Sequence, residues 1–346
     1  MSVPIGVALV GLGMWGRRVG AAASRSPGVR LVSCFARDRE TREDAARSLG
    51  CRPAPSLGSL LDDPEVEAVL VITPNHVHRE IVAAAAERGR HVFVEKPIAD
   101  TLESAEAIRQ ACRSAGVVLF VGHCFRRLGA SRAAERLVAS GALGTVVLAE
   151  ATFSLPGAFA PGSWRSRRQT LAGGPLTQLG IHHADTLQHW LGPAGAVHGS
   201  LVHLAASADI DDVAVAMLEH RSGARSVIAC SYVSPKTYAI RLSGTLATLE
   251  LRTDMSIWPA AERMDASTSL LLHGPDGGEE VRFEPIDMLV DELRAFARCI
   301  RNGNEPETGG SEGVAALRVI LGAVASSAEG RAVAIGEEAH AEHRPS

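Results

Sequence analysis

The chain has 346 residues, a formal net charge of -4 and 46% hydrophobic residues. This length and composition are typical of a globular protein with two domains, and they exclude a disordered or fibrous chain. The near-neutral charge would not attract a polyanion, so we expect no nucleic-acid partner. Six scattered cysteines without a Cys-x-x-Cys pair indicate neither a disulfide framework nor a thiolate zinc site, which favours the cytoplasm.

Short apolar runs alternate with helical patterns in the N-terminal third, which predicts a doubly wound parallel sheet. The first run has no basic lead-in and enters a glycine loop directly, so it predicts a strand and not a signal peptide. No stretch is long enough to predict a membrane span. The predicted strands are residues 6–10, 30–35, 68–72, 91–94 and 117–121, and the predicted helices include 76–88 and 102–114.

The pattern changes after residue 144. β-rich runs at hairpin spacing predict an open, mostly antiparallel sheet, so the fold class is α/β with a C-terminal α+β domain. We predict domains at residues 1–123 and 124–336, a closing helix that packs back on the first domain, and a frayed tail at 337–346. The predicted strands are 146–153, 197–204, 213–218, 226–233, 238–243 and 248–252, and the predicted helices are 176–191, 288–301 and 313–327.

The first predicted strand runs into the loop Gly11-Leu12-Gly13-Met14-Trp15-Gly16, which a helical pattern follows. Such a loop provides a tight turn at Gly11, close backbone approach to a pyrophosphate at Gly13 and close helix packing at Gly16. The phosphates then lie at the positive end of the helix. This pattern predicts a Rossmann domain that binds a nicotinamide dinucleotide. The alternative is a glycine-rich turn without a ligand.

The end of the second predicted strand bears on the choice between NAD and NADP. In NAD-binding domains an acidic residue about 20 positions after the motif binds the ribose. Ala36 occupies that place and Arg37 follows, and a guanidinium there suits the additional phosphate of NADP. We therefore favour NADP slightly. In the alternative, Arg37 is a solvated surface residue and Asp38 binds the ribose of NAD.

Two further motifs follow predicted strands, Thr73-Pro74-Asn75 after the third and Glu95-Lys96-Pro97 after the fourth. Both therefore lie at carboxyl ends of parallel strands, where open α/β sheets bind their ligands. Together with the glycine loop, and in this order, they closely resemble the glucose-fructose oxidoreductase / inositol dehydrogenase (Gfo/Idh/MocA) family. The segment 173–182 resembles the active-site helix in the second domain of that family, so the resemblance covers nearly the whole chain.

This resemblance implies an NAD(P)-dependent oxidoreductase that interconverts a secondary alcohol and a ketone on a sugar-, cyclitol- or polyol-like molecule. It implies that Lys96 moves the proton of the reacting oxygen, with a cis peptide bond before Pro97, and that His182 shares this task. It also implies a homodimer or homotetramer that pairs through the open sheet. Gln178 replaces the usual aspartate of the family, and because an amide forms only neutral hydrogen bonds, we assign it to orienting the substrate.

Other candidate residues flank these motifs. An aromatic ring beside a guanidinium, as in Trp164-Arg165, suits a sugar or an anionic substrate, and Arg126 is a similar candidate. His123 is a candidate for lining the cleft. Helical spacing places His182, Asp185 and His189 on one face, which leaves a metal site as an alternative, although we predict none. The predicted cofactor ligands are Gly11, Gly13, Met14, Trp15, Gly16, Ala36, Arg37, Thr73, Pro74, Asn75, His78, Glu95, Lys96 and Pro97.

Two other functions are open. A glycosidase of the same fold would use a recycled NAD for transient oxidation. A sensor would bind NAD(P) without turnover, because a fold alone does not establish catalysis.

Overall fold

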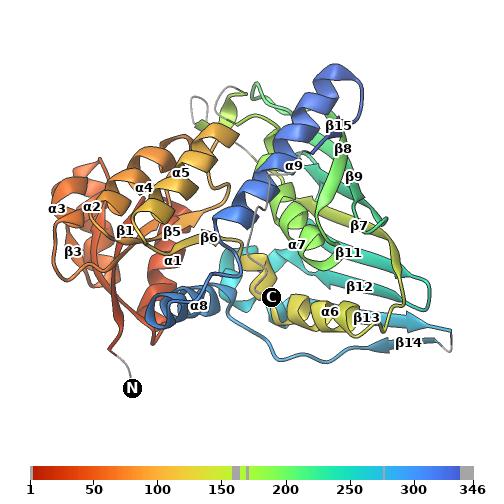
Figure 1. The fold of residues 1–346 in the computed structure, drawn as a ribbon, viewed down its shortest axis with the longest axis horizontal. Coiled ribbons are helices and arrows are strands. Elements are labelled where there is room, and N and C mark those ends of the chain that lie inside the picture. The colour runs from red at the N-terminus through yellow and green to blue at the C-terminus, as the bar shows by residue number, and fades with distance from the viewer. Residues whose placement is uncertain (1–2, 158–163, 169–170, 276, 336–346) are drawn as a thin grey trace, which may run out of the picture.

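The computed structural model describes residues 3–157, 164–168, 171–275 and 277–335 (Figure 1). The side chain of Trp164 and the predicted tail at 337–346 lie outside this described part. The described residues form a parallel sheet with its helices and a larger, mostly antiparallel sheet. Both predicted fold classes are confirmed.

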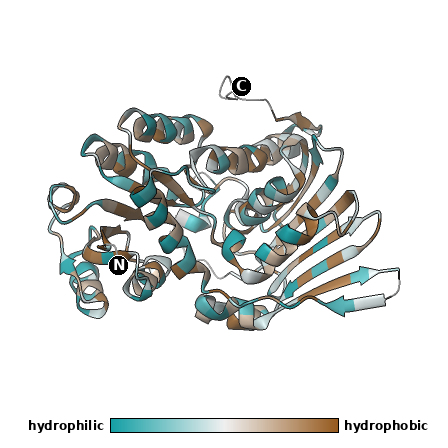
Figure 2. Cartoon of the chain, turned by 60° about the horizontal axis from the view of Figure 1, so that its bottom comes forward, coloured by the Kyte–Doolittle hydropathy of each residue, from teal (hydrophilic) through white to brown (hydrophobic). Residues whose placement is uncertain are grey.

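Six parallel strands in the described residues form the first sheet, in the order β3-β2-β1-β4-β5-β6. The central strands are buried along their whole length because helices cover both faces, and Figure 2 shows hydrophobic residues on them. The strand order reverses between β1 and β4, which opens a crevice at their carboxyl ends. The strands are β1 (Ile5–Val10), β2 (Val29–Phe35), β3 (Arg52–Pro53), β4 (Ala68–Val71), β5 (His91–Glu95) and β6 (Leu119–Gly122), and the helices are α1 (Met14–Arg25), α2 (Arg39–Leu49), α3 (Leu57–Leu61), α4 (His78–Glu87) and α5 (Leu102–Ser114).

The second sheet has nine strands in the described residues, in the order β14-β13-β12-β11-β7-β10-β9-β8-β15. Its pairs are antiparallel apart from β7 and β10, which are parallel. The prediction of six strands here omitted β13, β14 and β15. The strands are β7 (Val146–Ser154), β8 (Ala194–Val202), β9 (Val213–His220), β10 (Arg225–Ser231), β11 (Thr237–Gly244), β12 (Thr248–Thr253), β13 (Thr268–Gly274), β14 (Gly277–Glu280) and β15 (Val333–Ala334).

Helices α7 (Ile181–Leu191) and α9 (Gly310–Glu329) lie on the inner face of the second sheet (Figure 1). A single π turn, Leu176–Gly180, precedes α7. Helices α6 (Gly129–Ala139) and α8 (Met288–Asn302) complete the second half. The sequence analysis did not predict α6.

Helix α9 connects the two sheets. Val314 and Leu317 pack into a hydrophobic cluster with strands of the parallel sheet, while Gly199 of β8 lies so close that an added Cβ would come within 2.1 Å of the Ala323 carbonyl oxygen. By length and composition α9 could also cross a membrane, with 44% of its apolar window buried in the structure, whereas the sequence analysis expected no such segment. Its packing against both sheets accounts for its apolar character.

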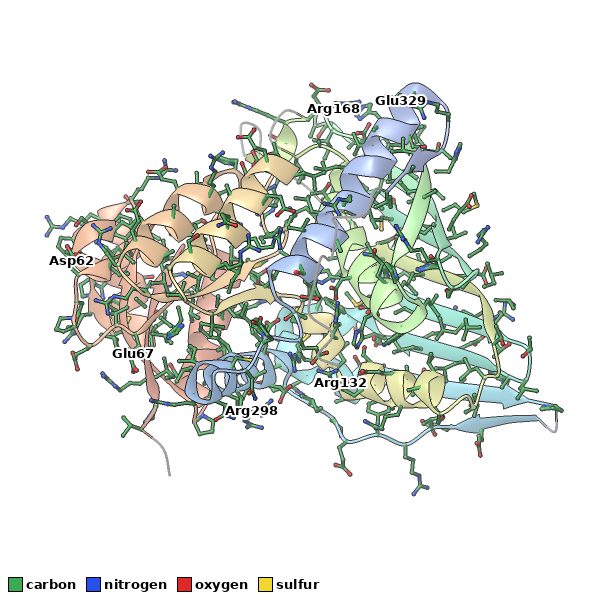
Figure 3. All side chains as sticks on the ribbon, viewed as in Figure 1. Asp62, Glu67, Arg132, Arg168, Arg298 and Glu329 are labelled. Atoms are coloured by element: carbon green, nitrogen blue, oxygen red, sulfur yellow. The ribbon has the colours of Figure 1, made fainter. Side chains whose placement is uncertain are left out.

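Helix α8 packs against one face of the parallel sheet, at β5 and β6. The ring of Phe296 packs edge-on against Phe93 of β5 and Phe120 of β6, with centroids 5.9 and 5.8 Å away. This aromatic cluster fixes the second half of the chain against the first. Side chains of both charges lie on the outer surface, as Asp62, Glu67 and Arg298 illustrate in Figure 3.

Candidate active site

A cavity of about 410 Å³ lies between the carboxyl ends of the parallel strands and the inner face of the second sheet. The loops after β1, β4 and β5 form one wall, and the π turn, α7, β7 and a segment containing Trp258 form the other. The cavity therefore joins residues as far apart in the sequence as Met14 and Trp258. The lining residues are Met14, Trp15, Ile72, Thr73, Asn75, Glu95, Lys96, Pro97, Phe153, Leu155, Pro156, Gly157, Arg165, Gln178, Leu179, His182, Tyr232 and Trp258.

The glycine loop has the shape that a dinucleotide pyrophosphate requires. Gly11 has a φ of +99°, and a Cβ on Gly16 would lie 1.9 Å from the Gly11 carbonyl oxygen, so neither position accepts a side chain. The space beside Gly13 is open to 4 Å. Helix α1 begins there without a side-chain cap and without an acidic residue in its first turn, so its free amides suit the phosphates.

Two buried oxygen atoms in the cavity wall lack a partner among the described residues. These are Oδ1 of Asn75 and Oγ1 of Thr73, both in the loop after β4. A buried polar atom without a hydrogen bond is destabilising by about 1–3 kcal/mol, so a bound polar group is favoured here. Together with the glycine loop, these atoms fit the predicted dinucleotide.

His78 lies behind this wall and is not among the lining residues. Its ring is 1% exposed, and its Nδ1 and Nε2 atoms lie 3.1 Å from the Ile98 carbonyl oxygen and 2.9 Å from that of Thr73. It therefore ties the loops after β4 and β5 together. His78 was predicted among the cofactor-binding residues; the structure places it behind the wall, where both ring nitrogens have protein partners.

The end of β2 displays Arg37 at the surface, while Ala36 is partly buried. The Ala36 carbonyl oxygen accepts a hydrogen bond from Arg42. Asp38 caps α2, because its Oδ1 accepts a hydrogen bond of 2.7 Å from the Thr41 amide. In the NAD alternative Asp38 binds the ribose, but here its carboxylate already accepts a hydrogen bond as the cap of α2.

Lys96 is directed into the cavity by the backbone of the facing domain. A cis peptide bond joins it to Pro97, and its Nζ donates a hydrogen bond of 2.7 Å to the carbonyl oxygen of Gln178. Burial lowers the pKa of Lys96, the Glu95 carboxylate opposes this shift, and Arg165 adds to it. The side chain at position 178 is not the group that holds the lysine, so the replacement of aspartate by glutamine leaves this contact intact.

Glu95 connects the glycine loop to Lys96. Its Oε1 accepts a hydrogen bond of 2.5 Å from Trp15 Nε1, and its Oε2 accepts one of 3.1 Å from the Lys96 amide. The Trp15 ring stacks on Trp258 at 5.8 Å, with the Arg18 guanidinium over both rings. Sequence reasoning did not identify Trp258, because no motif surrounds it and its partner lies in the other domain.

His182 lines the cavity one turn beyond Gln178. Its ring packs against Phe125 at 4.4 Å, and its buried Nδ1 has no partner among the described residues. Burial, followed by the charge of Lys96 and the neighbouring His123, lowers the pKa of His182 well below its usual 6.5. A neutral imidazole therefore faces the cavity at neutral pH.

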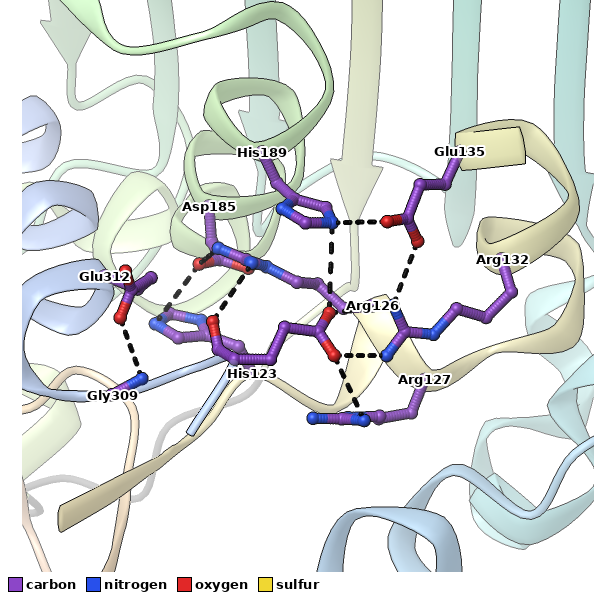
Figure 4. A network of polar contacts seen from close by, with 10 residues as sticks. His123, Arg126, Arg127, Arg132, Glu135, Asp185, His189, Gly309 and Glu312 are labelled. Atoms are coloured by element: carbon purple, nitrogen blue, oxygen red, sulfur yellow. Dashed lines mark hydrogen bonds and ion pairs between the residues drawn. The ribbon is translucent and has the colours of Figure 1, made fainter. Parts of the chain in front are cut away.

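Arg126 lies outside the cavity, which corrects its prediction as a substrate ligand. It is 5% exposed, and its guanidinium donates to both oxygens of Asp185, at 2.5 and 2.6 Å (Figure 4). His123 is also buried, with Nε2 3.8 Å from Asp185, and is not among the lining residues. The same network reaches Glu307, so it joins α7 to the segment before α9.

These contacts also argue against the metal alternative. The Asp185 carboxylate is paired with Arg126, and His189 Nε2 lies 3.0 Å from Glu135, so the helical face is occupied by protein partners. Of the three proposed ligands, His182 lines the cavity. On this face of α7, Asp185 and His189 therefore belong to an ion-pair network, whereas His182 belongs to the cavity.

The composition contains a further signal for Lys96 that the sequence analysis did not use. Of the 35 basic residues, two are lysines, Lys96 and Lys236, and the other 33 are arginines. An arginine stays protonated in proteins and cannot accept a proton, whereas a lysine can. At this position the chain therefore has a side chain that can accept a proton, which an arginine could not.

Comparisons with known proteins agree with this architecture. Residues 5–123 match the model described as "Oxidoreductase family, NAD-binding Rossmann fold", and residues 131–250 match the "GFO/IDH/MocA C-terminal domain". A 1,5-anhydro-D-fructose reductase from Ensifer adhaerens is 28% identical over 94% of this chain and 97% of its own length. A D-xylose 1-dehydrogenase (NADP(+)) from Haloferax volcanii is 30% identical over 86% and 89%.

A solved structure from Desulfitobacterium hafniense, described as a candidate NADPH-dependent oxidoreductase, has 33% identity and a TM-score of 0.94. The match covers 97% of this chain and 99% of that one. Both halves of the chain, the order of its motifs and its fold therefore lead to one assignment. The chain belongs to the Gfo/Idh/MocA family of NAD(P)-binding oxidoreductases.

Proposed function

We propose that this enzyme interconverts a secondary alcohol and a ketone on a sugar- or polyol-like molecule, with Lys96 and His182 as the groups that handle the proton. Both side chains line one cavity together with the loops after β1, β4 and β5, and this arrangement supports the proposal. The relatives named as a reductase of an anhydro sugar and a dehydrogenase of xylose support this substrate class.

A nicotinamide dinucleotide held by the glycine loop and by the loop after β4 would supply or accept the hydride. Neutral Lys96 accepts the hydroxyl proton during oxidation, and its ammonium form returns a proton to the oxygen during reduction. Neutral His182 holds the same oxygen by a hydrogen bond. Phe153, Leu179 and Trp258 form the apolar part of the wall beside these two groups.

The lowered pKa of Lys96 predicts opposite pH dependences for the two directions. Oxidation needs the unprotonated amine, so kcat/KM for oxidation should rise about tenfold per pH unit and level off below pH 10.5, the usual pKa of lysine. Reduction needs the ammonium form, so its kcat/KM should be constant where oxidation rises and should fall about tenfold per pH unit where oxidation levels off. Initial rates in both directions measure this. A rise in both directions, or a midpoint above 10.5, would contradict the assignment.

We propose NADP as the preferred cofactor, with Arg37 as the ligand of its additional phosphate. The exposed guanidinium of Arg37 and the use of Asp38 as a helix cap support this choice. Arg37→Gln should weaken NADPH binding about 10- to 100-fold and leave NADH binding nearly unchanged. Titration of tryptophan fluorescence measures both affinities. Arg39→Gln, in the adjacent exposed pair with Glu43, is the control, and tighter binding of NADH by the unmodified enzyme would refute the proposal.

We further propose a cytoplasmic enzyme that forms a dimer or tetramer through the outer face of the second sheet. The cysteines of the described part are all free, in agreement with a reducing compartment. The outer face carries Val215 and Met217 of β9, each 40% exposed, and charged residues of β7, β11 and β12 lie further along the sheet. Sedimentation of a strictly monomeric species would refute the oligomer.

A further inference from the structure

Two cationic side chains line the active-site cavity. Lys96 comes from the end of β5, and Arg165 comes from the short helix Trp164–Ser166, which precedes α7. Their charges act on one another, because Arg165 contributes to the lowered pKa of Lys96. The Gln178 carbonyl oxygen, 2.7 Å from Nζ, holds Lys96 in this position.

Negative charge in the cavity is limited to one carboxylate among the described lining residues. This is Glu95, and both of its oxygens already accept hydrogen bonds, one from Trp15 and one from the Lys96 amide. Burial also raises the pKa of Glu95, which weakens it as a counter-charge. Position 178, where the resemblance places an aspartate, holds an uncharged glutamine. When Lys96 is in its ammonium form, the described lining therefore carries more positive than negative charge.

The surroundings act differently on the two cations. Phe153, Leu179 and Trp258 form apolar walls that strengthen electrostatic attraction at Lys96. Arg165 is exposed, so solvent screens part of its charge. A guanidinium binds the paired oxygens of a carboxylate or a phosphate through two parallel hydrogen bonds. The cavity thus has the chemistry of a site for a molecule that carries an anionic group.

We propose that the substrate is an acidic sugar or polyol, with its carboxylate or phosphate bound by Arg165 and its reacting alcohol or ketone at Lys96 and His182. This inference rests on the proposed function, because it places a second group of the same substrate. Carboxylate and phosphate share the charge and the paired oxygens that the guanidinium recognises, so the test includes both.

The test is calorimetric titration of the enzyme saturated with oxidised cofactor. Three matched pairs are compared, D-gluconate with D-glucitol, D-glucuronate with D-glucose, and a hexose phosphate with the free hexose. We expect at least one acid to bind about 10- to 100-fold more tightly than its neutral partner, and this preference to weaken at high salt. The acid that binds separates carboxylate from phosphate. Equal or tighter binding of every neutral partner, or binding of none of the six, overturns the proposal.

Variants assign the preference to a residue. Arg165→Gln should abolish the preference for the acid, and Arg165→Lys should retain part of it. Arg168→Gln is the matched control, because Arg168 is close to Arg165 in the sequence but is not among the lining residues. Melting temperatures check folding. An acid preference that persists in Arg165→Gln refutes the role of Arg165, whereas turnover of neutral sugars without acid preference refutes this inference and leaves the proposed function intact.

Discussion

Replacing Lys96 with methionine is expected to lower kcat by about 10²- to 10⁴-fold, the usual contribution of a positioned acid or base. Methionine keeps an unbranched apolar stem but has no proton to give or accept. The hydrogen bond from Nζ to the Gln178 carbonyl oxygen is lost as well, so the two cavity walls lose a direct link. Steady-state kinetics in both directions measures the loss, and fluorescence titration should show cofactor binding within a few-fold of the unmodified enzyme.

The composition offers an unusually direct control for this experiment. Lys236 is exposed, lies outside the cavity lining and is the other lysine of the chain, so Lys236→Met should leave kcat unchanged. A lysine-directed reagent should inactivate the unmodified enzyme and Lys236→Met alike, and bound cofactor should protect both. Full activity in Lys96→Met would refute the catalytic assignment. Loss of cofactor binding together with activity would point to a structural role for Lys96.

The parallel domain could be predicted well because its signals are local. The strand that runs into the glycine loop and the motifs after β4 and β5 each combine an apolar run with a turn, and these patterns survive in a single sequence. β13 was missed for the opposite reason. In its sequence Thr-Ser-Leu-Leu-Leu-His-Gly, Leu270 is the buried position, so no alternation of period two marks it as a strand.

The chemistry of the site could be predicted from motifs, whereas its contacts could not. Glu95 and Trp15 are 80 positions apart, and Lys96 reaches the backbone of a residue 82 positions away. A backbone carbonyl oxygen is present at every position, so no residue pattern identifies the one that accepts a given hydrogen bond. For Arg126 the predicted partner was wrong. Its position just after a strand suggested that it binds an anionic substrate, but the structure pairs it with Asp185. Helical spacing had instead suggested Asp185 as a possible metal ligand.

The pairing of Arg126 with Asp185 predicts a large effect on stability. Both side chains are buried, and the guanidinium donates to both carboxylate oxygens. Arg126→Met should therefore reduce the free energy of unfolding by about 3–5 kcal/mol, because it leaves an uncompensated buried carboxylate. Urea unfolding followed by far-ultraviolet circular dichroism measures this change. The destabilisation should be accompanied by lower activity, since Asp185 is one turn from His182 on α7.

The double variant Arg126→Met/Asp185→Leu separates the charge from the packing. It removes the unpaired carboxylate, so it should recover most of the stability that Arg126→Met loses, because a well-packed apolar pair replaces a buried ion pair at little cost. The surface pair of Arg88 and Asp62 is the control, with Nε 2.8 Å from the carboxylate but both side chains open to solvent. Arg88→Met should change the free energy of unfolding by less than about 1 kcal/mol. If Arg126→Met were no more destabilising than Arg88→Met, the buried pair could not be what fixes the position of α7 and of His182 on it.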